Sequence, residues 1–156
     1  MPIYYFHLIK LAIFLLSLVI LVPRNEIRRL TIYGIIFGSF YDVIGLTIGY
    51  FTNTFRWINF NPFGYGYIPI DSPISWCTFF IMYFYLLPKN KQFIYIFPIA
   101  GVVMSMIYSR VLVNLKMFIE PVLFLRIANF ILWFSLATWG YLKLKEYIER
   151  KNNNPS

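Results

Sequence analysis

Cysteine and histidine each occur only once among the 156 residues, and this scarcity excludes several kinds of functional site. The lone Cys77 has no partner for an internal disulfide and does not make a metal site. The lone His7 excludes HExxH and other multi-histidine metal motifs, and its position is typical of a polar anchor rather than a catalytic base. No Ser-His-Asp pattern is visible, and no glycine-rich phosphate loop follows a strand. We therefore predict no catalytic, metal-binding or cofactor-binding residue, no cofactor and no enzyme activity.

Charged residues are also scarce, at 13%, whereas 60% of the residues are hydrophobic and 22% are aromatic. A typical soluble domain is about half apolar and about a quarter charged, so this composition indicates a protein embedded in lipid. The formal net charge of +8 would suggest nucleic acid only if the basic residues formed a soluble face. They lie instead in short loops and a tail beside apolar segments, as membrane insertion favours. The expected partner is the lipid bilayer, with no nucleic acid.

Five long apolar blocks fill almost the whole chain. A bilayer core of ~30 Å needs about 20 helical residues to span it; four blocks reach that length and the third is slightly short. The connectors leave no room for a soluble domain, so residues 1–156 are predicted to form a single all-α integral membrane bundle of five transmembrane helices. A four-span bundle with a re-entrant third block is the alternative. The blocks run over about residues 3–22, 30–51, 72–87, 93–113 and 121–142, followed by a tail, 143–156.

The block boundaries carry local signals. The first block is expected to stay in the protein as a helix, because Lys10 comes too late for the positive region of a signal peptide and no small-residue cleavage site follows. Pro73 and Pro121 suit first helical positions, and Pro88 ends the third helix. Pro98 either starts the fourth helix late or kinks its first turn.

The basic residues outside the blocks sort onto alternate connectors. Nine lie in the first connector, the third connector and the tail, and two lie in the second and fourth connectors. Because positively charged loops stay in the cytoplasm, this bias predicts an external N-terminus and a cytoplasmic C-terminus. The nine are Arg24, Arg28, Arg29, Lys89, Lys91, Lys143, Lys145, Arg150 and Lys151, and the two are Arg56 and Lys116.

The second block has the clearest helix-packing pattern. Gly34, Gly38, Gly45 and Gly49 fall on one face of an uninterrupted α-helix, as two GxxxG pairs. Such a face lets another helix approach closely. Its partner is expected to be a neighbour within the chain, with homodimerisation through the same face as the alternative.

Several charged residues lie within the blocks, in the outer half of the predicted bundle. A mid-membrane aspartate costs ~2.5–3.5 kcal/mol, so Asp42 should face protein or water rather than lipid. Three interpretations are open: a structural ion pair of Asp42 with Lys10 or Arg126, a polar cavity for ion coupling or ligand binding, and a neutral, hydrogen-bonded Asp42. The candidate intramembrane polar cluster comprises Lys10, Asp42, Arg110 and Arg126, with Asp71 and Glu120 at the outer surface.

The connector between the second and third blocks, residues 52–71, is long and aromatic. Its rings are typical of anchors at the headgroup level, and a partly re-entrant lid over the bundle is the alternative. The rings are those of Trp57, Phe60, Phe63, Tyr65 and Tyr67.

The overall layout resembles the uncharacterised small multi-pass membrane proteins of spore-forming Firmicutes. The segments that carry the resemblance are RNEIRR after the first block, YIPIDSPISW before the third and LLPKNK after it. This resemblance implies a bacterial cytoplasmic membrane and no assigned activity.

The sequence thus favours a non-catalytic membrane protein that binds a protein partner or a lipid in the cell envelope. The alternative is a small ion- or proton-coupled transporter that uses Asp42. Transporters usually contain paired repeats or broken helices around a midplane site, and no internal repeat is visible in this chain.

Overall fold

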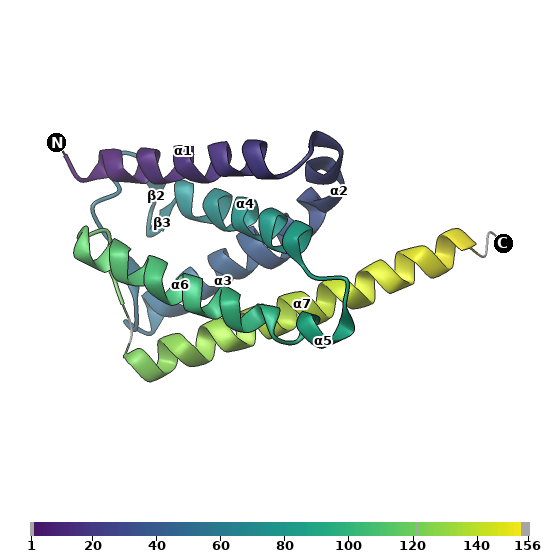
Figure 1. Cartoon of the computed structure of the whole chain (residues 1–156). Helices are drawn as coiled ribbons and strands as arrows, with labels where there is room; N and C mark the ends of the chain where they lie inside the picture. Colours follow the sequence, from purple (N-terminus) through teal and green to yellow (C-terminus); the bar gives the residue numbers. More distant parts are fainter. Residues whose placement is uncertain (1, 121, 154–156) are drawn as a thin grey trace.

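The structure is a computed structural model that describes residues 2–120 and 122–153, apart from the side chains of Lys91, Glu149 and 151–153. Long helices lie side by side, and α1 begins at the end of the bundle opposite to the one where α7 finishes (Figure 1). The helices are α1 (Tyr4–Leu21), α2 (Arg24–Gly34), the π-helical η1 (Ile35–Phe40), α3 (Tyr41–Phe51), α4 (Asp71–Leu86), α5 (Lys91–Ile94), α6 (Phe97–Asn114) and α7 (Leu123–Asn153).

Four helical stretches are long and apolar enough to cross a membrane, which confirms the prediction of a mostly helical chain with several helices of membrane-spanning length. They are Tyr4–Leu21, Arg24–Phe51, Gln92–Asn114 and Leu123–Ile148. The second stretch combines α2, η1 and α3, and the third joins α5 to α6.

The remaining block forms α4, which is the most enclosed helix of the bundle. Nine of its 16 residues are buried, against three of 18 in α1. It begins at Asp71 beside the start of α1, and near its other end Phe84 contacts the rings of Tyr33 and Tyr141. The helix therefore runs from one end of the bundle to the other, but it is not among the four stretches of membrane-spanning length, so the four-span alternative stays open. Its ~24 Å length, at 1.5 Å per residue, is shorter than a bilayer core.

Most helix boundaries lie close to the predicted ones. The second and the last helices differ from prediction, and Pro98 decides between two predicted alternatives. The second helix begins at Arg24 rather than Leu30, so the first basic connector is helical and only Val22 and Pro23 separate it from α1. Pro98 lies in the first turn of α6, after the short α5, as the late-start prediction required. The last helix continues to Asn153 through most of the predicted tail. The expected role of Pro121 lies outside the described residues.

The second long helix is interrupted by η1. A π-helix bonds residue i to residue i+5 and so places more residues in each turn, which rotates α3 relative to α2. Two side chains hold the segment: the Ser39 hydroxyl donates to the Pro73 carbonyl over 2.8 Å, and Trp133 Nε1 donates to the Phe37 carbonyl over 2.6 Å. The predicted glycine face assumed an uninterrupted α-helix, so the four glycines do not share one neighbour.

These glycines have three different surroundings. A Cβ atom on Gly34 would lie 2.7 Å, and one on Gly38 2.5 Å, from the nearest atom of α4. Gly49 packs against the ring of Phe55, whereas a Cβ on Gly45 would meet nothing within 4 Å. Close helix packing therefore uses Gly34 and Gly38, and its partner is a neighbour within the chain. Homodimerisation through this face stays a prediction.

Short strands close the end of the bundle where α1 begins. Strand β1 (Arg56–Trp57) pairs with β4 (Phe118–Ile119), and β2 (Gly64–Tyr65) pairs with β3 (Ile68–Pro69), both antiparallel. The first pair ties the long aromatic connector to the connector between α6 and α7. Asn59 strengthens the tie, because its Nδ2 donates to the carbonyl of Lys116 over 2.8 Å.

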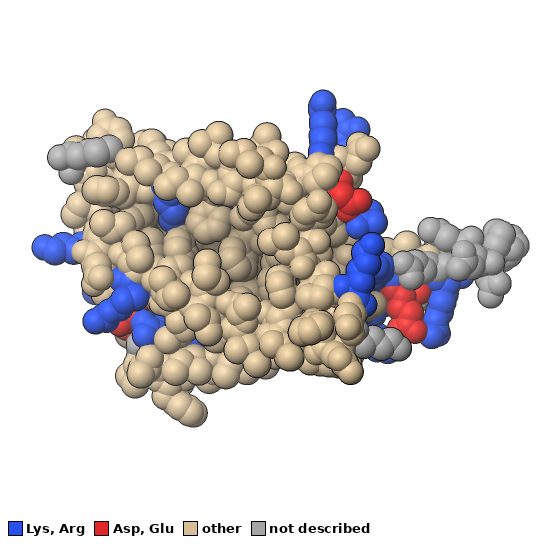
Figure 2. Space-filling model, in the orientation of Figure 1, with Lys and Arg blue, Asp and Glu red and all other residues tan. Residues whose placement is uncertain are grey.

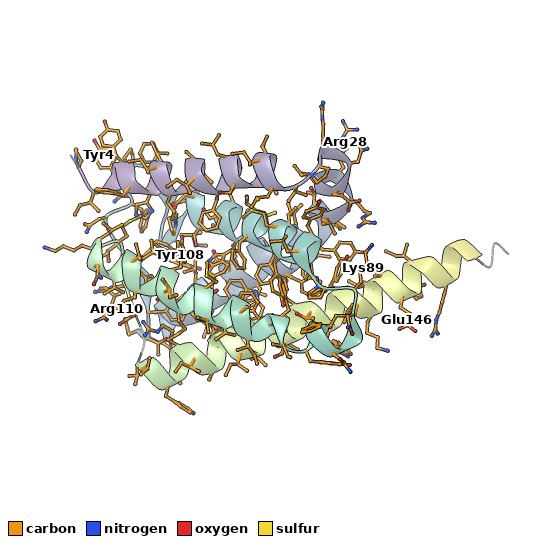
Figure 3. All side chains as sticks on the ribbon, in the orientation of Figure 1. Tyr4, Arg28, Lys89, Tyr108, Arg110 and Glu146 are labelled. Atoms are coloured by element: carbon orange, nitrogen blue, oxygen red, sulfur yellow. The ribbon has the colours of Figure 1, made fainter. Side chains whose placement is uncertain are left out.

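Basic side chains gather toward the two ends of the molecule, and a broad band of uncharged atoms separates them on the face shown in Figure 2. Arg28, Lys89 and Glu146 lie at one end, whereas Tyr4 and Arg110 lie at the other (Figure 3). The first and third connectors of the chain therefore lie at one end of the bundle, and the second and fourth connectors lie at the other end.

Candidate functional site

A buried polar group at the closed end is built from α1 and α4. His7 is fully buried, and its Nδ1 lies 3.1 Å from each carboxylate oxygen of Asp71. Because an ionised carboxylate only accepts hydrogen bonds, Nδ1 donates. Lys10 forms an ion pair with the same carboxylate, and its Nζ lies 4.1 Å from the centroid of the Trp57 ring. Asp71 thus binds two side chains of α1 and fixes α4 against it.

The local sequence explains this geometry. His7 and Lys10 are three residues apart in α1 and so share one face of the helix. Asp71 is the first residue of α4, where the partial positive charge of the helix N-terminus favours a carboxylate. The adjacent Ser72 is also buried and turns toward α3.

Asp42 lies next to this group without joining its ion pairs. It is buried, and its Oδ2 accepts a hydrogen bond of 2.8 Å from the Ser72 hydroxyl. Among the residues that the structure describes, no ion pair joins Asp42 to Lys10 or Arg126. Of the three interpretations, the ion pair of Asp42 with Lys10 or Arg126 does not form, and the hydrogen bond from Ser72 agrees with a hydrogen-bonded Asp42. A functional polar cavity stays a prediction. The start of α4 brings Asp71 to Lys10, and this placement of a distant carboxylate could not be read from the spacing within one helix.

Arg126 has a different carboxylate partner, Glu120. Glu120 forms an ion pair with Arg126 through Oε2, and its Oε1 accepts a hydrogen bond of 3.0 Å from Arg110 Nη1. In residues 2–120 and 122–153, no hydrogen bond or ion pair connects this trio with the group around Asp71. The six residues of the predicted cluster thus form two separate groups, with Asp42 beside the first.

The long aromatic connector covers the first group. Trp57 and Phe60 are buried, and their rings lie 5.5 and 6.4 Å from the ring of His7. Tyr65, in contrast, is 90% exposed. Part of the connector therefore closes the bundle over this group, and its tip projects outward. Anchoring of its rings at the headgroup level and a re-entrant lid both stay predictions.

A pocket of about 350 Å³ lies between α3, α6 and α7, beneath the connectors. Asp42 and Gly45 line it from α3, Ser109 from α6, and Arg126 and Asn129 from α7. This position explains the open space beside Gly45. The pocket brings Asp42 and Arg126 to one cavity although they do not pair.

Eight of the 19 residues that line the pocket are aromatic. The rings of Tyr41 and Trp133 are stacked with centroids 4.7 Å apart, and the rings of Trp76 and Trp133 lie 4.4 Å apart. The other aromatic residues of the lining are Phe55, Trp57, Tyr108, Phe118 and Phe130. In Figure 3, Tyr108 lies within the bundle, whereas Arg110 lies at its end. Ser109 is buried, and its hydroxyl makes no hydrogen bond within the described residues.

His7 was expected to be a polar anchor, on one face of the first helix with Lys10, Phe14 and Ser17. The structure places it in the buried group around Asp71 instead. Its spacing from Lys10 was the available signal, because two polar residues three apart on an otherwise apolar helix indicate a buried polar face. Ser72 was interpreted only as a helix cap, and its hydrogen bond to Asp42 depends on the packing of α4 against α3. No group of three or more metal-ligating side chains is placed to hold a metal ion in the part of the chain that the structure describes.

No protein-family model, curated protein or solved structure matches this chain.

Proposed function

We propose that the chain is a multi-pass protein of the cell membrane that crosses the bilayer five times, with its N-terminus outside and its C-terminus in the cytoplasm. The end that carries Arg28 and Lys89 would face the cytoplasm, and the end that carries Arg110 would face outward. Two observations support this topology. The basic connectors and the last turns of α7 meet at one end, as the positive-inside rule requires. In addition, α4 is enclosed by longer helices, so its shorter length does not have to match the lipid thickness.

Cysteine labelling tests the topology. Tyr65 and Lys89 are both exposed and lie in connectors predicted to be on opposite sides. In a Cys77→Ala background, a membrane-impermeant maleimide added to intact cells should label Tyr65→Cys but not Lys89→Cys. Permeabilised cells provide the control, because both sites should then react. Labelling of Lys89→Cys in intact cells would overturn the proposed orientation.

We further propose that the protein is not an enzyme and binds a lipid or another amphipathic molecule in the pocket between α3, α6 and α7. The pocket carries this proposal, since it is about 350 Å³ in volume and its walls are mainly apolar with a few polar groups. Ligand sites typically have volumes of ~300–1,000 Å³ and this kind of lining. No arrangement of a nucleophile with a base lines the pocket among the described residues.

The position of the pocket fits an amphipathic ligand. In the proposed topology, Asp42 lies nine residues from the outer end of α3, or ~14 Å deep at 1.5 Å per residue. Thr52 and Thr54 line the pocket closer to the headgroup level. A ligand could thus keep a polar part near these residues and place its apolar part along the aromatic walls.

Filling the pocket tests the proposal. Gly45→Phe places a ring in open space within the pocket, whereas Ser135→Phe fills the apolar groove between α6 and α7 and serves as the matched control. A photoreactive diazirine fatty amphiphile should label residues 41–57 of the unmodified chain. Labelling should fall roughly tenfold in Gly45→Phe and little in Ser135→Phe, because only the first removes the volume that the ligand needs. Equal labelling of both variants would contradict a role for this pocket.

The transporter alternative is supported by one observation, the location of Asp42 in the pocket lining. Transport differs from binding alone because it requires a flux of ligand across the membrane, which can be measured in proteoliposomes. If Asp42→Asn folds normally but abolishes ligand-driven flux across proteoliposomes, transport is favoured; if no flux occurs with the unmodified chain, binding alone is favoured.

A further inference from the structure

Asp42 and Arg126 both line the pocket, but the two side chains do not form an ion pair with each other. Lys10, the nearest candidate, is bound to Asp71, and Arg126 is bound to Glu120. Asp42 has a single hydroxyl donor, Ser72, among the described residues. A buried carboxylate is costly unless a positive group compensates it. Asp42 therefore has no ion-pair partner among the described residues, and a bound cation would supply one.

The aromatic walls indicate which kind of cation fits. The face of an aromatic ring attracts cations, and Trp rings attract them most strongly. Tyr41, Trp76 and Trp133 lie together in the wall, and Trp133 is held in place by its hydrogen bond to the Phe37 carbonyl. Trp133 is stacked on Tyr41 and is 4% exposed, so a cation would meet only those parts of this ring cluster that reach the pocket. Because the cluster is already positioned, the cost of ordering it is low.

Ser109 provides a second, independent indication of a ligand. Its side chain lines the pocket and is 4% exposed, yet its Oγ has no hydrogen-bond partner in the described part of the chain. Buried hydroxyls are nearly always satisfied. A hydroxyl can rotate so that its oxygen lone pairs face a cation.

The same lining disfavours a divalent metal ion such as calcium or magnesium. Calcium takes 6–8 oxygen ligands and magnesium takes six, whereas Asp42 supplies the only carboxylate that lines this pocket among the described residues. Aromatic rings with one carboxylate suit an organic cation, whose charge is spread over carbon and hydrogen atoms.

We propose that the pocket binds the ammonium group of an organic cation, with Asp42 as its counter-ion and the rings of Tyr41, Trp76 and Trp133 as its cage. This inference rests on the proposed function, because it names the ligand class of the same pocket. The ammonium group belongs either to a lipid headgroup or to a small soluble molecule, and chain length distinguishes the two sources.

Tryptophan fluorescence of the full chain in uncharged maltoside micelles tests the inference. Trp139→Phe removes the one tryptophan outside the pocket, so that Trp57, Trp76 and Trp133 report on it. The probes are decyltrimethylammonium and its neutral isostere, in which a tert-butyl group replaces the trimethylammonium group. The ammonium probe should saturate at roughly tenfold lower concentration, because only it gains the ion pair and the cation–π contacts. Asp42→Asn should abolish this preference, and Glu146→Gln, at the opposite end, should retain it.

The outcomes separate the two proposals. If both probes bind the unmodified chain equally, and Gly45→Phe blocks both, the pocket is a binding site but the cation inference fails. If neither probe binds, or if Gly45→Phe leaves the binding of both probes unchanged, the proposed function itself fails. An ammonium preference that choline also shows supports a soluble cation, and a preference limited to the decyl probe supports a lipid. Because the isostere comparison uses the unmodified pocket, it remains decisive if Asp42→Asn fails to fold.

Discussion

Asp71→Asn is expected to lower the free energy of unfolding by about 3–5 kcal/mol, the usual loss when one partner of a buried ion pair is removed. The Asp71 carboxylate is 3% exposed and holds both His7 and Lys10. Asparagine has nearly the same shape, so the change removes charge and leaves Lys10 buried without a counter-ion. Unfolding in mixed micelles, followed by circular dichroism during a sodium dodecyl sulfate titration, measures the loss.

A surface ion pair provides the matched control for this prediction. Glu146 is bound to Arg150 and Lys143 at the opposite end of the bundle, and all three side chains are substantially exposed. Glu146→Gln should change stability by at most ~1 kcal/mol, since exposed pairs contribute little. The double variant Asp71→Asn with Lys10→Met should recover part of the loss because it removes the uncompensated charge. Equal effects of Asp71→Asn and Glu146→Gln would contradict the structural role of the buried group.

The buried group also shows how far the sequence could predict the site. The depth of a residue in a helical bundle follows from its position in the helix, at 1.5 Å per residue. Lys10, Asp71, Arg126 and Glu120 were therefore assigned correctly to one end of the bundle. Their pairing depends on how the helices are rotated and on where the long connector places the start of α4. These are properties of packing between distant segments, and the sequence alone predicted the wrong partner for Lys10.

The helices themselves were more predictable, because hydrophobic length is a local property. Four of the five apolar blocks form stretches of membrane-spanning length. The extension of the second helix back to Arg24 was not predicted, since a basic connector was assumed to be a loop. Arg29 and Glu26 form an ion pair one turn apart within this segment, which an isolated helix turn can support. The π-helical segment was also unexpected, because it depends on partners from α4 and α7.

Because the π-helical segment rotates α3, replacing Gly38 and replacing Gly45 by alanine should change the stability of the protein in opposite directions. A Cβ on Gly38 would lie 2.5 Å from the Trp76 carbonyl oxygen, and backbone atoms of α4 cannot move aside as a flexible side chain can. Gly38→Ala should therefore destabilise the protein by about 1–3 kcal/mol through overpacking, or prevent folding. Gly45→Ala meets open space and should be neutral or stabilise the helix by up to ~1 kcal/mol, because alanine has less conformational freedom to lose.

The same detergent titration measures both variants, and each is the control for the other because the chemical change is identical. A uniform glycine face, as in an uninterrupted α-helix, would give losses of similar size at the two positions. A loss only at Gly38 would instead indicate that η1 turns Gly45 away from the helix contact and toward the pocket. If Gly45→Ala is as destabilising as Gly38→Ala, then α3 does not have the rotation described here, and the placement of Asp42 in the pocket would have to be abandoned with it.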